Sequence, residues 1–143
     1  MSKEITIELR DLAIGYPHRV VAEGLSATVY SGELTCLIGS NGVGKSTLLR
    51  TIAAFQPKLG GSILVRGGEI DGYKSRELAQ LISVVLTERI EVGHMTVLDL
   101  VSLGRSLYTG FWGKVDAANE RKALDALRLV GMERFAPRDV GTL

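Results

Sequence analysis

The chain has 143 residues, of which 45% are hydrophobic and 23% charged, and its formal net charge at pH 7 is +1. This composition predicts a globular protein with a hydrophobic core rather than a disordered chain. A near-neutral charge without blocks of like charges gives no indication of a nucleic-acid or anionic-lipid partner. No apolar run approaches the roughly 20 residues of a membrane-spanning helix, and residues 1–10 lack the apolar centre of a signal peptide. We therefore expect a cytoplasmic address.

The first third of the chain shows β-strand patterns. Apolar and polar residues alternate at Ile5–Leu9 and Leu25–Val29, which predicts half-buried strands separated by a break at Gly15–Pro17. The nearly continuous apolar run Leu34–Ile38 is typical of a strand covered on both faces. It contains the single cysteine, Cys36, which we expect to be a small buried hydrophobe because the chain offers it no partner.

The middle of the chain changes period. From Ser46 apolar residues recur three and four positions apart, which predicts a helix whose apolar face holds Leu48, Leu49, Ile52 and Phe55. Glycine pairs and β-branched residues then predict a strand at Ser62–Val65, followed by a short helix at Ser75–Gln80 and a strand at Ile82–Leu86.

The last third is helical in pattern. Thr96 and Asp99 have the spacing that caps a helix over Val97–Gly104. A second helix is predicted from a cap at Asp116 to Gly131 at the C′ position, with the buried stripe Ala123, Leu124, Leu127 and Val130. The aromatic loop 108–113 between them either packs internally or faces a partner. We expect two parts, an α/β core over residues 1–87 and a helical part over residues 88–143.

The strongest chemical signal is a glycine-rich loop between the strand and the helix of the core. Gly39-Ser40-Asn41-Gly42-Val43-Gly44-Lys45-Ser46 fits the pattern G-x-x-x-x-G-K-[ST] in full. Glycines 39, 42 and 44 permit positive φ and bring backbone N–H groups close to phosphate oxygens at a helix N-terminus.

Three side chains complete this loop. Lys45 supplies a cation to the β and γ phosphates, and the Ser46 hydroxyl is placed to ligate Mg²⁺, with the Thr47 hydroxyl beside it. The loop predicts a nucleoside triphosphate site but leaves the reaction open, because GTPases, nucleotide kinases, helicases and transporters all use it.

The wider sequence resembles ATP-binding subunits of ABC transporters. The resemblance rests on Gly15-Tyr16, Arg19-Val20-Val21, Leu25–Val29, Gly32-Glu33 and the loop continued through Thr47-Leu48-Leu49. It extends to Gly61-Ser62-Ile63 and to Met95–Arg105, and around Gly104-Arg105 it is most similar to importers of iron siderophores, haem and cobalamin.

The resemblance implies an α/β fold, with a P-loop NTPase core, N-terminal antiparallel β segments and the start of a helical subdomain, and it implies ATP and Mg²⁺ as ligands. Tyr16 matches the aromatic residue that stacks on adenine, although an ordinary turn tyrosine also fits. Val20 matches the apolar residue beside base and ribose, although strand-edge packing explains it equally well. Glu88 stands where the family has a glutamine that reaches Mg²⁺, so Glu88 and Ser46 are the candidate metal ligands; a solvated Glu88 beside Arg89 is the alternative.

The resemblance also implies partners and an activity. Such subunits hydrolyse ATP as dimers with a second ATP-binding subunit, beneath integral membrane permease subunits, at the cytoplasmic face of the membrane, with an external solute-binding protein acting indirectly. The family's Ser-Gly-Gly signature, Walker B glutamate and switch histidine do not occur after the glycine loop. The catalytic residues therefore stay unassigned, and we expect an N-terminal fragment that does not turn over ATP alone.

Two other functions use the same loop. A small-molecule kinase needs an acceptor site and normally carries its glycine loop near the N-terminus, whereas β segments precede Gly39 here. A protein that binds ATP without turnover is the third candidate.

Overall fold

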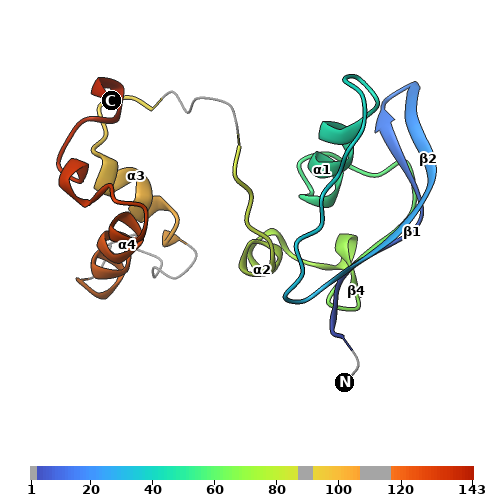
Figure 1. The fold of residues 1–143 in the computed structure, drawn as a ribbon, viewed down its shortest axis with the longest axis horizontal. Helices are drawn as coiled ribbons and strands as arrows, with labels where there is room; N and C mark the ends of the chain where they lie inside the picture. Colours follow the sequence, from blue (N-terminus) through green and yellow to red (C-terminus); the bar gives the residue numbers. More distant parts are fainter. Residues whose placement is uncertain (1–2, 87–91, 107–116) are drawn as a thin grey trace. The chain divides into compact units, whose positions relative to one another are not determined.

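The computed structural model describes residues 3–86, 92–106 and 117–143. The chain divides into two compact units, Met1–Val84 and Val85–Leu143 (Figure 1). The first unit contains all the strands of the described residues, and the second is helical. The predicted mixed α/β class, with antiparallel strands near the N-terminus, is confirmed.

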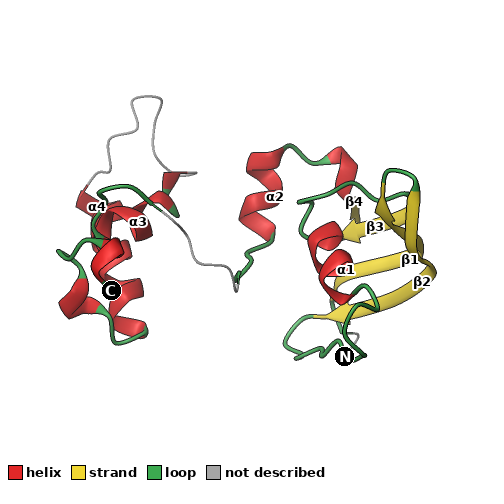
Figure 2. Ribbon diagram, turned by 90° about the horizontal axis from the view of Figure 1, so that it is seen from above, coloured by secondary structure: helices red, strands yellow, loops and turns green. Residues whose placement is uncertain are grey.

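The first unit is built on an antiparallel sheet with the strand order β2-β1-β3-β4 (Figure 2). The strands are β1 (Ile5–Tyr16), β2 (Arg19–Tyr30), β3 (Gly60–Val65) and β4 (Gly68–Glu69). The strands predicted at Ile5–Leu9, Leu25–Val29 and Ser62–Val65 lie within β1, β2 and β3 and are therefore confirmed. The alternation buries one set of β1 and β3 side chains in a core that includes Leu12, Ile14 and Ile63.

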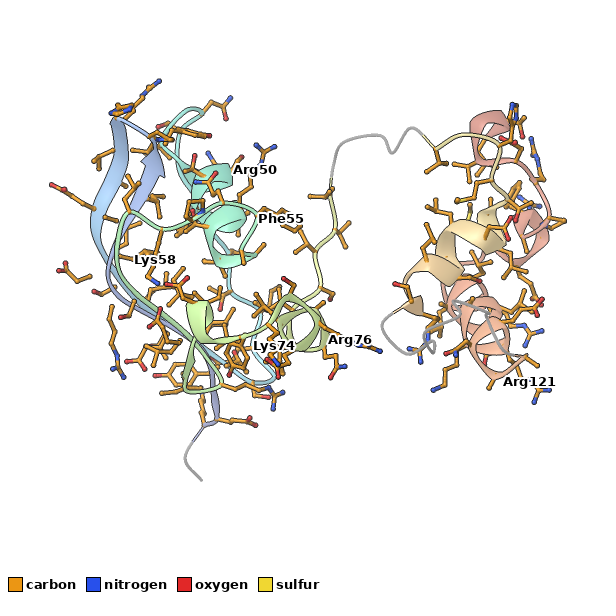
Figure 3. All side chains as sticks on the ribbon, turned by 180° about the vertical axis from the view of Figure 1, so that it is seen from behind. Arg50, Phe55, Lys58, Lys74, Arg76 and Arg121 are labelled. Atoms are coloured by element: carbon orange, nitrogen blue, oxygen red, sulfur yellow. The ribbon has the colours of Figure 1, made fainter. Side chains whose placement is uncertain are left out.

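Helix α1 (Lys45–Ile52) covers one face of this sheet (Figures 1 and 2). Its partly buried Leu48 and Ile52 pack against the sheet core, as predicted. Leu49 and Phe55, assigned by sequence to the same face, are exposed, and that prediction is wrong. Figure 3 shows Phe55 on the side of α1 away from the hairpin of β1 and β2.

Two threonines take the place of those apolar side chains in the α1 interface. Thr47 and Thr51 are buried one turn apart, and the Thr51 hydroxyl donates to the carbonyl of Thr47 at 2.8 Å. A hydroxyl satisfied within its own helix is buried at little cost, so an apolar period alone misplaces this face.

Helix α2 (Ser75–Leu81) follows a 3₁₀ turn, η1 (Ile70–Gly72), and its Leu78 closes the sheet core. The predicted helix at Ser75–Gln80 is confirmed. Lys58, labelled in Figure 3, ties this region to the loop after α1, because its ammonium donates to Glu69 at 2.9 Å and also to Asp71.

Two predicted strands are absent from the structure. Leu34–Ile38 forms no strand, and Leu34 and Ile38 are 91% and 90% exposed. Ile82–Leu86 is irregular as well, with Val85 fully open to solvent. Strand formation requires neighbours for the backbone N–H and C=O groups, and the described residues provide no strand paired with either segment. Cys36, predicted to be buried, is exposed for the same reason.

The second unit pairs α3 (Val97–Leu103) with α4 (Ala117–Leu129), followed by the 3₁₀ turns η3 (Glu133–Phe135) and η4 (Val140–Thr142). The predicted cap of α3 is confirmed. The Thr96 hydroxyl accepts from the Asp99 N–H at 3.1 Å, and the Asp99 carboxylate accepts from the Thr96 N–H at 3.1 Å. These bonds satisfy N–H groups at the helix start, and the hydrogen bond from the Thr96 hydroxyl holds the pKa of Asp99 below its usual range.

The end of α4 fits the predicted glycine stop. Gly131 adopts φ +69°, its N–H donates to Arg128, and the Met132 N–H donates to Leu127 at 2.8 Å. This pair of hydrogen bonds to backbone carbonyls is the Schellman motif, and it ends α4 at Leu129. Val130, predicted to be part of the buried stripe, is consequently exposed. Asp116 and the aromatic loop 108–113 lie outside the described residues.

Candidate functional site

The glycine loop leads into α1 with backbone geometry that only glycine adopts easily. Gly42 has φ +82° and Gly44 has φ +106°, and Gly44 is the N-cap of α1. Gly39, predicted to share this freedom, is outside the left-handed region. No side chain caps the helix, so the unpaired N–H groups of its first turn, which carry partial positive charge, are left for a ligand.

Lys45 folds back over this loop. Its ammonium donates to the carbonyl oxygens of Gly39 and Ser40, both at 2.7 Å. The two bonds hold the cation at the centre of the loop, beside the N-terminal turn of α1. A ligand that offers anionic oxygens at this point can replace the carbonyls as acceptors.

The loop packs closely against β2. A Cβ placed on Gly44 would lie 2.6 Å from Cγ1 of Val21, well inside van der Waals contact. A Cβ on Gly42 would meet nothing within 4 Å. Gly44 is therefore required both by its backbone angle and by its neighbour, and the contact sets the position of the loop relative to the sheet.

A pocket of about 430 Å³ lies between the loop and the end of the β1–β2 hairpin. Figure 1 shows the loop before α1 and this end of the hairpin on the same side of the unit. The structure brings together eight of the predicted binding residues as its lining: Tyr16, Val20, Asn41, Gly42, Gly44, Lys45, Ser46 and Thr47. Gly39, Ser40 and Val43 are not part of that lining, although the first two hold Lys45 through their carbonyls.

The end of the β1–β2 hairpin, which forms one wall of the pocket, is fixed by contacts behind it. The Gln56 amide donates to the carbonyl of Gly15 at 3.1 Å, which ties the segment after α1 to the residue preceding Tyr16. Gly15 is buried, and a Cβ there would lie 2.2 Å from the carbonyl oxygen of Arg19. Tyr16 and Val20, 46% and 57% exposed, are thus presented on a fixed backbone with their side chains accessible.

Two pocket residues were not assigned as binding residues from the sequence, Arg19 and Val21. Both lie in the stretch that carries the family resemblance. The signal for Arg19 was its position across a two-residue turn from Tyr16, because residues paired in this way share a face of the hairpin.

The candidate metal ligands are only partly described. Ser46 lines the pocket, whereas Glu88 lies outside the described residues.

Among residues 3–86, 92–106 and 117–143, no helix is long and apolar enough to cross a membrane.

The glycine-rich loop has a lysine that donates back to the loop carbonyls, leads into a helix without a side-chain cap, and lines one pocket together with Tyr16 of the hairpin. These are the features of a P-loop. Comparisons with known proteins identify the family. The ABC transporter family matches residues 22–143. The chain belongs to this family.

Two relatives and one solved structure illustrate the match. An ABC transporter ATP-binding protein of Methanocaldococcus jannaschii is 38% identical over 89% of this chain and 44% of its own length. The probable siderophore transport system ATP-binding protein YusV of Bacillus subtilis is 36% identical over 96% of this chain and 50% of its own length. A nucleotide-free ATP-binding cassette from an ABC transporter superposes with a TM-score of 0.79 at 23% identity, covering 97% of this chain and 59% of that one, which shows the shared fold. The chain spans about half the length of the relatives it matches.

Proposed function

We propose that the chain is the ATP-binding part of an ABC importer ATPase subunit, and that the subunit powers uptake of an iron complex or cobalamin. The observation that carries the nucleotide assignment is the pocket in which Lys45, the open start of α1 and Tyr16 converge. The siderophore relative in Bacillus subtilis supports the class of solute. The antiparallel strands before the loop argue against a small-molecule kinase.

ATP fits this pocket with its phosphates on the loop. The Lys45 ammonium exchanges its two carbonyl acceptors for oxygens of the β and γ phosphates, while the first N–H groups of α1 donate to the same phosphates. A bound Mg²⁺ would neutralise part of the triphosphate charge, and the Ser46 hydroxyl in the pocket lining is the residue that would hold it.

The base occupies the hairpin side of the pocket. The exposed ring of Tyr16 offers a π face for adenine, and the exposed Val20 beside it contacts base and ribose. Stacking of this kind accepts either purine, so we expect ATP and GTP to differ only modestly in affinity.

Glu88 has a proposed role at the phosphate end. A carboxylate about 4 Å from a phosphate charge is repelled by roughly 4 kcal/mol at an effective dielectric of 20. If Glu88 approaches the γ phosphate, as the family's glutamine does, Glu88→Gln strengthens metal-free ATP binding and weakens its dependence on Mg²⁺. ATP affinities measured with Mg²⁺ and with chelator test this; equal ratios in both proteins would show that Glu88 stays away from the phosphates.

The partners follow from the same proposal. The subunit works with a second ATP-binding subunit and with integral membrane permease subunits, at the cytoplasmic face of the membrane, and a solute-binding protein is an indirect partner of this assembly. ATP hydrolysis is an activity of that assembly rather than of this chain alone.

A chimera tests the function directly. Residues 1–143 of this chain replace the matching half of the Bacillus subtilis siderophore relative, and cells are assayed for siderophore-dependent uptake of iron. We expect uptake by the chimera and none by its Lys45→Ala form. A chimera that binds ATP as tightly as the parent but supports no uptake would refute the importer assignment while leaving the nucleotide site intact.

A further inference from the structure

Arg19 occupies a defined position in the wall of the nucleotide pocket. It is the first residue of β2 and pairs directly with Tyr16, the last residue of β1. Residues directly opposite each other in an antiparallel pair project their side chains to the same face. Arg19 and Tyr16 accordingly both line the pocket, on a hairpin end whose backbone is fixed by Gly15 and Gln56.

The charge of Arg19 has no partner within the described part of the chain. Its exposed side chain makes no hydrogen bond or ion pair there. Other surface arginines of the same unit are paired, Arg10 with Glu8 and Arg66 with Glu4. An arginine that a fold positions but leaves unpaired is available to an anionic ligand.

The pocket as a whole favours negative charge. Of the residues that line it, Arg19 and Lys45 are the charged ones, and both are cations. They stand on different walls, Lys45 held at the centre of the loop and Arg19 on the hairpin beside Tyr16. Two cations in one concave site raise the local concentration of an anion more than either does alone.

This separation indicates which part of the ligand Arg19 meets. A nucleotide with its base on Tyr16 and its terminal phosphates at Lys45 carries its ribose and α phosphate across the space between them. We propose that the Arg19 guanidinium binds the α phosphate, as a second cationic contact in addition to Lys45. The proposal rests on the proposed nucleotide site and deepens it, because it assigns the α phosphate a partner from the hairpin.

Stacking of the guanidinium on the outer face of the base is the competing geometry. The α phosphate is favoured because the pocket lining offers Arg19 no carboxylate, and a phosphate supplies both the charge and the planar pair of acceptors that a guanidinium prefers. The two geometries differ in a measurable way, since one requires a phosphate and the other a base.

The test uses three probes on the 143-residue chain: ATP, inorganic tripolyphosphate and adenosine. Arg19→Gln removes the charge but keeps a polar side chain of similar reach. We expect this substitution to weaken the binding of ATP and of tripolyphosphate by the same factor, roughly five- to tenfold for an exposed charge contact. The affinity for adenosine should stay unchanged. The salt dependence of ATP binding becomes shallower, because one screened contact is lost. Arg66→Gln is the matched control, an exposed arginine of the same unit outside the pocket, and leaves all three affinities unchanged.

The other outcomes overturn the proposal in distinguishable ways. Unchanged ATP and tripolyphosphate affinities in Arg19→Gln, with Lys45→Ala still weakening both, would reject the Arg19 contact alone. A fall in adenosine affinity equal to the fall in ATP affinity in Arg19→Gln would assign Arg19 to the base instead. Unchanged ATP affinity in Lys45→Ala, or no ATP binding by the parent chain, would reject the nucleotide site together with the proposal. Circular dichroism of each variant confirms that the fold is retained, and Arg19→Lys, which restores the charge, should recover part of the affinity.

Discussion

Replacement of Gly44 by alanine tests how the loop is held against the sheet. The new Cβ meets Cγ1 of Val21 at 2.6 Å, and the residue must keep φ +106°. The backbone term costs about 1–2 kcal/mol for a residue with a Cβ, and overpacking of this kind adds about 1–3 kcal/mol. We expect Gly44→Ala to destabilise the first unit by about 2–5 kcal/mol and to weaken ATP binding. Gly42→Ala, with φ +82° and open space around its Cβ, has only the backbone term of about 1–2 kcal/mol.

The assay for these variants is hydrogen exchange of the β1 amides, which reports the free energy of opening of that unit. A double variant, Gly44→Ala with Val21→Ala, removes the clash but not the backbone strain. The double variant should therefore lose less free energy of opening than the sum of the losses in the two single variants, by about 1 kcal/mol or more. Equal losses for Gly42→Ala and Gly44→Ala, or strict additivity in the double variant, would refute the argument from the Val21 contact.

Three further predictions concern other parts of the fold. Gln56→Leu removes the hydrogen bond to the Gly15 carbonyl and should lower the free energy of opening, measured by hydrogen exchange of the β1 amides, by about 1 kcal/mol. The affinity for adenosine should fall more than the affinity for tripolyphosphate. Lys58→Met leaves Glu69 without its cation in a half-buried place and should cost about 1 kcal/mol of thermal stability, whereas loss of the exposed Lys3–Glu33 pair should cost less. Asp99→Asn should lower the Tm of the second unit at pH 7. Because the hydrogen bond from the Thr96 hydroxyl lowers the folded pKa of Asp99 from its ordinary value, the stabilisation by Asp99 is fully present above the unfolded pKa and is lost as the pH falls through the folded pKa, so the Tm difference between wild type and variant should shrink as the pH is lowered. A Tm difference that stays constant as the pH is lowered would contradict the role of the charge.

The features predicted well from sequence are those set by local chemistry. The glycine loop, the start of α1 and the α3 cap depend on residues within a few positions of one another, and the structure has all three. The strands of the β1–β2 hairpin follow from alternation and a short turn, and Tyr16 and Val20 of this hairpin both line the pocket.

The features predicted poorly depend on distant partners. The apolar run Leu34–Ile38 has the composition of a buried strand, but burial requires covering elements and paired strands, which the described residues do not supply. The buried face of α1 was predicted wrongly because the Thr51 hydroxyl bonds within its own helix, which allows Thr51 to be buried, while Leu49 and Phe55 are exposed. Arg19 was missed as a pocket residue because its significance lies in pairing across the hairpin, which a linear pattern does not display.

The central claim is that the loop around Lys45 binds the phosphates of a nucleotide. Isothermal titration of ATP into the parent chain and into Lys45→Ala, with Lys58→Ala as a lysine control outside the pocket, measures this directly. Charged contacts to phosphate are worth about 1.5–3 kcal/mol each, so Lys45→Ala should weaken ATP binding by at least about tenfold. Lys58→Ala should leave the affinity unchanged as long as the fold is retained. Equal affinities for the parent chain and Lys45→Ala would contradict the assignment of the site.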